Sequence, residues 1–134
     1  MMIRSILRWT ILALALGAAA PTQAQGYALI GAWRCQGATM GASIVYDVVF
    51  NADGYYSGTY AAANGFRAYS EGPYRLAGNI LRIDFQVWEA QPQQTANPGG
   101  DTYNVQFQGS EGMALLLSRC AQSPECRLQC RRNR

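Results

Sequence analysis

Apolar and polar positions alternate along most of this chain, which predicts strands rather than helices. From residue 27 onward, runs of β-branched and aromatic residues are separated by Gly, Asn or Asp at intervals of about ten residues. Residues 80–88 show the pattern most cleanly. Their apolar members are Leu81, Ile83, Phe85 and Val87, with Arg82, Asp84 and Gln86 between them. A period of two residues indicates a strand with one buried face. Because residues 25–118 show no convincing helical period, we expect an antiparallel meander.

We expect strands wherever this alternation runs between turn residues. The expected strands cover residues 43–50, 55–62, 66–76, 80–88, 101–108 and 113–120, after a first strand that begins near Gly31. The pair Asp53-Gly54 suits a hairpin turn, because glycine adopts a left-handed backbone conformation without steric cost. Pro73 interrupts its strand and should lie at an edge or a bulge. Residues 91–100 lack periodicity and contain two prolines, which predicts a loop.

Strands with one apolar face must either close into a barrel or pair as two sheets. Closure removes exposed edges, so the fold class we expect is all-β, a small antiparallel up-and-down β-barrel of about 7–8 strands with a short C-terminal helix. The helix is expected from about Pro124, where Ser123 is a suitable N-cap and Glu125 lies in the first turn. On such a helix Cys126 and Cys130 would share one face.

The first 24 residues have the composition of a secretory signal peptide. Arg4 and Arg8 precede an apolar stretch, residues 9–20, which is shorter than the roughly 20 residues that a membrane span needs. The small residues Thr22 and Ala24 suit a cleavage site. We therefore expect cleavage after Ala24, no stable membrane insertion afterwards, and a periplasmic or secreted protein; a permanent anchor is the alternative that the short stretch disfavours.

The residues after the expected cleavage site are enough for one domain. We expect the barrel over residues 25–120 and a short, basic, disulfide-tethered helix or tail over residues 121–134. The charge divides in a similar way, because residues 25–118 hold four arginines and seven acids whereas residues 119–134 hold five arginines and one acid. A basic tail of this kind is either solvated or in contact with an anionic surface. In an exported chain we expect no nucleic-acid partner.

The residue types that catalysis needs are largely missing. The chain has no His, no Lys and no G-x-S-x-G motif, and its acids are spread one per strand or turn. Catalysis needs a nucleophile beside a base, converging carboxylates or a metal, so we expect no enzyme and no catalytic residues. The four cysteines lack the paired short spacings of a zinc site, and we expect neither a metal nor a cofactor.

Several short motifs resemble those of small bacterial lipocalin-like (calycin-type) barrels. They are the G-x-W motif at Gly31-Ala32-Trp33, a T-D-Y-like motif at Asp101-Thr102-Tyr103 with two residues exchanged, the hairpin Asp53-Gly54-Tyr55, the strand Gly72-Pro73-Tyr74, and a late Arg119. The resemblance implies that Trp33 packs at the closed end of the barrel and that Arg119 lies across its ring as a cation-aromatic contact. Gly31 would be a structural residue of the same strand.

An even number of cysteines in an exported chain indicates two disulfides. If the closing pair just described points into the barrel, Cys35 faces inward and Cys120 faces outward. Direct pairing of Cys35 with Cys120 is then awkward, and Cys126 and Cys130 on one helix seldom reach disulfide geometry. We therefore expect one of Cys126 and Cys130 to bind Cys35 and the other to bind Cys120.

The aromatic residues admit two interpretations. They either line a cavity for a small apolar ligand or fill the core, since aromatic residues are favoured in strands anyway. The candidate ligand-binding residues are Tyr46, Tyr56, Tyr60, Phe85, Tyr103 and Phe107. We expect a non-enzymatic binding or scaffold protein of the bacterial envelope, whose partner is a small apolar molecule or another envelope protein. The alternative is a periplasmic inhibitor of a protease or lysozyme that uses the loop at residues 91–100.

Overall fold

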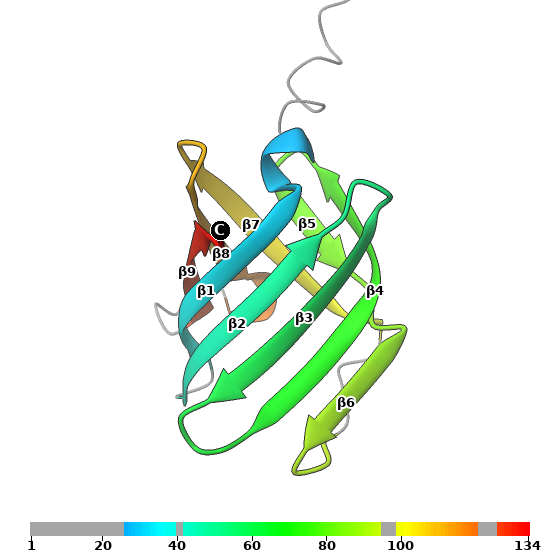
Figure 1. Ribbon diagram of the computed structural model, residues 1–134, viewed down its shortest axis with the longest axis vertical. Coiled ribbons are helices and arrows are strands. Elements are labelled where there is room, and N and C mark those ends of the chain that lie inside the picture. Colours follow the sequence, from blue (N-terminus) through cyan, green and yellow to red (C-terminus); the bar gives the residue numbers. More distant parts are fainter. Residues whose placement is uncertain (1–25, 40–41, 95–98, 121–125) are drawn as a thin grey trace, which may run out of the picture.

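The structure is a computed structural model that describes residues 26–39, 42–94, 99–120 and 126–134. In these described residues, a helical turn at residues 26–29 is followed by nine strands and a short 3₁₀ helix (Figure 1). They are β1 (Gly31–Thr39), β2 (Ala42–Phe50), β3 (Tyr55–Ala62), β4 (Arg67–Ala77), β5 (Ile80–Ile83), β6 (Val87–Gln91), β7 (Asp101–Gln108), β8 (Gly112–Leu117), η2 (Ser118–Cys120) and β9 (Arg127–Arg132). The expected signal peptide and its cleavage site lie outside the described residues.

Eight of the strands close into an antiparallel barrel. The strand order is β3-β2-β1-β9-β8-β7-β5-β4-β6, and a further pairing of β3 with β4 joins the two sides. The expected all-β barrel is therefore confirmed. Every neighbouring pair around the wall is antiparallel, so the hydrophobic alternation of each strand places one set of side chains inside.

Strand β6 is the one strand of the nine described that is not part of the eight-stranded wall, and it departs from that wall (Figure 1). The long strand β4 pairs with β5 over one half and with β6 over the other. Between the two halves, residues 84–86 face residues 72–73, so a bulge divides the single strand expected over residues 80–88. Gly72 allows this close approach, because a Cβ there would lie 1.8 Å from the Asp84 carbonyl oxygen. Pro73 lies beside the bulge, as expected.

The C-terminal segment is a strand, and the expected helix from Pro124 is wrong for its described part. β9 pairs with β1 on one side and with β8 on the other, and so completes the wall. Leu128 and Cys130 are buried while Gln129 and Arg131 are exposed, which is a strand period. The segment is a strand despite its helix-start residues, because pairing with two neighbouring strands and burying one face stabilise it more than its weak intrinsic helix preference does. Residues 127–132 thus belong to the barrel rather than to a separate tail.

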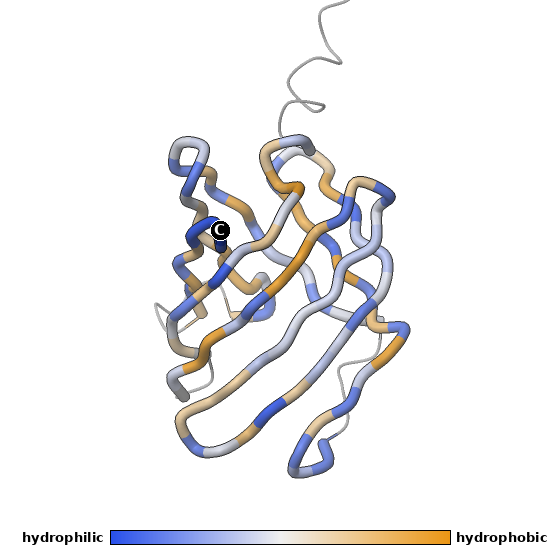
Figure 2. Tube along the Cα trace, viewed as in Figure 1, coloured by the Kyte–Doolittle hydropathy of each residue, from blue (hydrophilic) through white to orange (hydrophobic). Residues whose placement is uncertain are grey.

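The barrel interior is a single hydrophobic core. Its largest fully buried side chains are Trp33, Tyr46, Tyr56, Phe50, Leu29, Leu81, Ile83, Met113, Leu115 and Leu128. Figure 2 shows a long hydrophobic stretch along β2, whose inward residues pack against this core. Within the described part of the chain, no helix is long and apolar enough to cross a membrane.

Two disulfides tie the end of the chain to the barrel. Cys35 of β1 binds Cys130 of β9, and Cys120 binds Cys126. This confirms the expected division, in which the two C-terminal cysteines each take one of the other two. Cys35 and Cys130 face each other as direct partners in the ladder and are fully buried. Disulfides of this kind fit an oxidising compartment.

Candidate binding site in the barrel lumen

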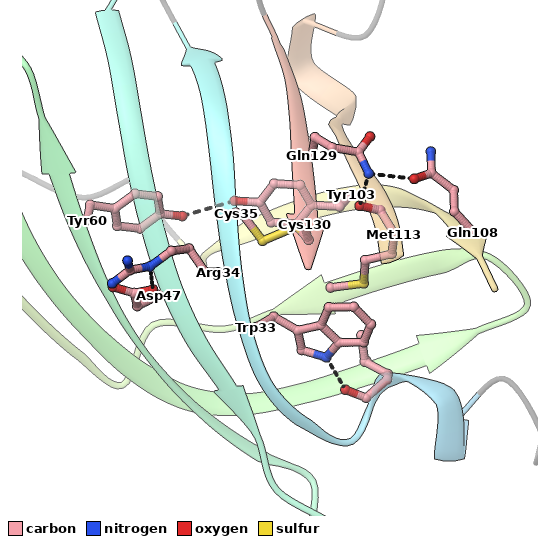
Figure 3. The surroundings of a disulfide bond; sticks show 11 residues. Trp33, Arg34, Cys35, Asp47, Tyr60, Tyr103, Gln108, Met113, Gln129 and Cys130 are labelled. Carbon is pink, nitrogen blue, oxygen red and sulfur yellow. Dashed lines mark hydrogen bonds and ion pairs between the residues drawn. A yellow bond between two sulfur atoms is a disulfide. The ribbon is translucent and has the colours of Figure 1, made fainter. Parts of the chain in front are cut away.

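One end of the barrel is closed around Trp33. The indole Nε1 of Trp33, labelled in Figure 3, donates a hydrogen bond at 2.9 Å to the carbonyl oxygen of Leu29. Leu29 belongs to the helical turn at residues 26–29 and is itself fully buried. The Arg132 guanidinium lies over the Trp33 ring at 4.4 Å. It donates hydrogen bonds to the carbonyl oxygens of Ala28, Ile30 and Ser110 at 2.6, 2.6 and 2.9 Å.

The expected contact between Trp33 and Arg119 is therefore wrong. Arg119 follows β8, which runs away from the closed end, and its Nη2 lies 3.8 Å from an Asp101 carboxylate oxygen. Arg132 makes the contact with the Trp33 ring instead, because the last strand of the barrel is β9 and not β8. Gly31 lies beside this contact: its φ is +125°, and a Cβ there would lie 2.7 Å from Nη1 of Arg132.

Toward the other end, the lumen holds a group of hydroxyl side chains that we call the hydroxyl cluster: Tyr46, Tyr56, Tyr60, Ser70 and Tyr103. The rings of Tyr46 and Tyr60 are stacked, with centroids 4.0 Å apart and planes at 2°. The hydroxyl groups of Tyr60 and Tyr103 form a hydrogen bond across the barrel at 3.1 Å (Figure 3). Beside them, the Tyr56 hydroxyl donates to Ser70 Oγ at 3.2 Å.

The Tyr46 hydroxyl is the unusual member of this cluster. It is buried, and no hydrogen bond of ordinary geometry reaches it from the described residues, although the stacked Tyr60 phenol lies close enough to raise its pKa. Gly58 makes its position attainable, since a Cβ at residue 58 would lie 2.5 Å from a ring carbon of Tyr46 and 2.8 Å from its hydroxyl. A buried polar group without a partner costs about 1–3 kcal/mol, so folds rarely retain one without a reason.

The phenols of the cluster are neutral hydrogen-bond donors at physiological pH. Burial raises the pKa of Tyr46, Tyr60 and Tyr103 well above the ordinary value, and the charge interaction with a neighbouring phenol raises each of these pKa values further. Burial likewise raises the pKa of Tyr56 to about 12. The cluster therefore offers O–H donors rather than phenolates to whatever meets it.

Asp101 and Arg119 lie beside the cluster. The Asp101 residue is 9% exposed, and its charge contributes to the raised pKa of the four phenols. The Arg119 side chain is 45% exposed. A carboxylate at the edge of an apolar lumen and a guanidinium nearer to solvent give this end of the barrel the polar character that the Trp33 end lacks.

The structure brings together four of the six candidate ligand-binding residues. Tyr46, Tyr56, Tyr60 and Tyr103 belong to the hydroxyl cluster. Phe107 is half-buried and pairs with Met113 in the ladder, and Phe85 lies in the bulge with its ring centroid 5.1 Å from that of Trp88. Sequence reasoning missed Ser70 and Asp101. The alternation of β4 places Ser70 on the inward face, and that signal could have identified it.

No group of three or more His, Cys, Asp or Glu residues in the described segments could hold a metal ion. The loop expected over residues 91–100 is described only at its two ends, because residues 95–98 lie outside the described residues, and its inhibitory role stays a prediction. Comparisons with protein-family models and with curated proteins find no match to this chain. The closed barrel is compatible with a calycin-like fold.

Proposed function

We propose that this protein is a non-catalytic, lipocalin-like binding protein of an exported, oxidising compartment, and that it holds a small amphipathic molecule at the hydroxyl cluster. The observation that carries the proposal is the buried, unpartnered Tyr46 hydroxyl beside the Tyr60–Tyr103 pair. The exported location is supported by the signal-peptide composition of residues 1–24 and by the two disulfides.

The cluster favours a ligand that accepts hydrogen bonds. Tyr46 has an O–H donor without a partner among the described residues, and the Tyr60–Tyr103 pair keeps a second O–H proton beyond the bond that it shares. A carbonyl or carboxylate oxygen has two lone pairs and accepts from both. The stacked phenol rings and the surrounding apolar core would pack against the rest of the molecule.

The proposal is tested by titrating the mature, disulfide-bonded protein with decanoic acid and measuring the heat of binding by calorimetry. We expect saturable one-to-one binding, about tenfold weaker in Tyr46→Phe and in Tyr103→Phe, because each change removes one hydrogen bond and keeps the ring. Tyr69→Phe is the matched control, since the Tyr69 hydroxyl donates to Glu71 on the outer face of the wall. The proposal fails if decanoic acid does not bind, or if Tyr46→Phe and Tyr103→Phe bind as tightly as Tyr69→Phe.

A further inference from the structure

A hollow runs along the outer edge of β6. Its volume is about 560 Å³, and it is lined by Trp88, Glu89, Ala90 and Gln91 together with Gln93 and Gln94. The first four residues are consecutive in one strand. β4 pairs with one side of β6 and contributes no residue to this lining, so the hollow lies on the other side of the strand.

Within the described residues, this edge of β6 has no strand paired to its main-chain groups. β6 ends the strand order, and among the described strands it pairs with β4 alone. The described backbone hydrogen bonds outside the ladders include none that joins residues 87–91 to another segment. Gln93 and Gln94 form the opposite wall, where the Gln94 carbonyl oxygen accepts a hydrogen bond from the Trp88 indole at 2.8 Å.

We propose that the β6 edge binds an extended segment of another protein by strand addition. Alternating N–H and C=O groups of an edge are matched by another extended backbone, which supplies the same groups in the opposite sense. Four residues of β6 span about 13 Å, the length of a four-residue extended segment.

A second copy of this chain fits the edge poorly. The centred antiparallel pairing of two β6 strands would place Glu89 of one copy opposite Glu89 of the other, and like charges directly opposite are destabilising. Glu89 is exposed and forms no ion pair with the described residues. The partner segment therefore carries a basic residue opposite Glu89. In the partner segment, the residues before and after this basic residue point to the other face of the sheet, where Trp88 and Ala90 favour apolar side chains.

The test uses a capped pentapeptide, Thr-Val-Arg-Val-Thr, whose binding to the full mature protein is followed by NMR chemical-shift changes. We expect saturable shifts confined to β6 and to Gln93 and Gln94. Two backbone-methylated versions are the controls, one methylated at the arginine amide and one at both valine amides. Only alternate amides of an added strand face its partner, so one version should bind at least tenfold more weakly and the other should bind as before. Equal binding by both versions would overturn strand addition.

Charge reversal tests the choice of partner independently of the lumen. Glu89→Lys should weaken binding of the arginine peptide about fivefold. The same variant should restore binding of the peptide that carries glutamate in place of arginine. Asp53→Lys, in the exposed turn between β2 and β3, is the matched control, because Asp53 also forms no ion pair with the described residues, and it should leave both affinities unchanged. Sedimentation of the peptide-free protein gives the remaining outcome, because a dimer that the arginine peptide dissociates would show that the occupant of the edge is a second copy.

Discussion

Replacing Arg132 tests whether this side chain closes the barrel. In the folded protein its guanidinium lies 4.4 Å from the Trp33 ring centroid and donates to three carbonyl oxygens. The side chain is 20% exposed, so these interactions are only partly screened by solvent. Arg132→Ala removes all of them at once and leaves the carbonyl oxygens at the closed end without their donor.

The expected cost follows from these contacts. A hydrogen bond to a charged group contributes about 1.5–3 kcal/mol, and a partly desolvated cation-aromatic contact contributes about 1 kcal/mol. Three such bonds share one guanidinium and solvent can reach part of the site, so we expect about 3–4 kcal/mol rather than the full sum. For a domain of this size, that loss lowers Tm by about 15 °C. Arg132→Lys keeps the charge without the planar fork and should lose about half as much.

The assay is chemical denaturation at pH 7, followed by tryptophan fluorescence and far-ultraviolet circular dichroism. Arg131→Ala is the matched control, since the Arg131 side chain is exposed and lies on the outer face of the same strand; surface changes of this kind stay within about 0.5 kcal/mol. The reasoning is refuted if Arg132→Ala is as stable as Arg131→Ala, or if Arg119→Ala is the more damaging change.

Further predictions concern the lumen and the disulfides. Tyr46→Phe should stabilise the ligand-free protein by about 1 kcal/mol in urea denaturation, because it removes a buried hydroxyl without a partner; a loss of stability would show that the hydroxyl is satisfied. Gly58→Ala should cost about 2–3 kcal/mol in the same assay, because the new Cβ displaces the Tyr46 ring, and a neutral effect would contradict the packing. Removing the Cys35–Cys130 disulfide should cost about 4–5 kcal/mol in the chain-entropy model, whereas removing the other disulfide, which closes a much shorter loop, should cost about half of that. Stability should fall as the pH rises above 10. A phenol whose pKa is higher in the folded state contributes its full stability below the unfolded-state pKa and loses that contribution as the pH rises toward the folded-state pKa. Ultraviolet titration should then show the four buried phenols ionising only with unfolding, and free titration of all eight tyrosines at pH 10 would contradict their burial.

Most of the barrel could be predicted from its sequence, because the strand period is a local property. The expected strand at residues 43–50 differs from β2 by a single residue at its start, and the strand at residues 55–62 coincides with β3. The bulge could not be predicted, since it depends on the approach of two backbones at Gly72 and Asp84.

The C-terminal strand shows the limit of local reasoning. Ser123, Pro124 and Glu125 are a sound helix-start pattern, yet the alternation of Leu128 and Cys130 with polar residues was too short to compete with it on sequence alone. The segment is a strand because it pairs with the edges of both β1 and β8, and that pairing is known only from the folded barrel. Without β9 the last strand of the barrel is β8, and the sequence pattern then places Arg119 rather than Arg132 in the closing position.

The hydroxyl cluster was partly predictable. The inward positions of Tyr46, Tyr60 and Tyr103 follow from the alternation of their strands, so they could be named as candidates. Their mutual contacts could not, because the Tyr60–Tyr103 hydrogen bond joins residues from opposite parts of the wall. The unpartnered Tyr46 hydroxyl depends on the absence of a side chain at Gly58, which is a property of the folded packing.

The most direct test of the binding proposal is an NMR titration of protein whose tyrosine and tryptophan rings carry ¹³C, with decanoic acid added to saturation. We predict that the ring signals of Tyr46, Tyr60 and Tyr103 shift together along one saturation curve, while those of Trp33 at the closed end stay in place. Saturable binding that leaves the three tyrosine rings unchanged, or no binding at all, would contradict the account.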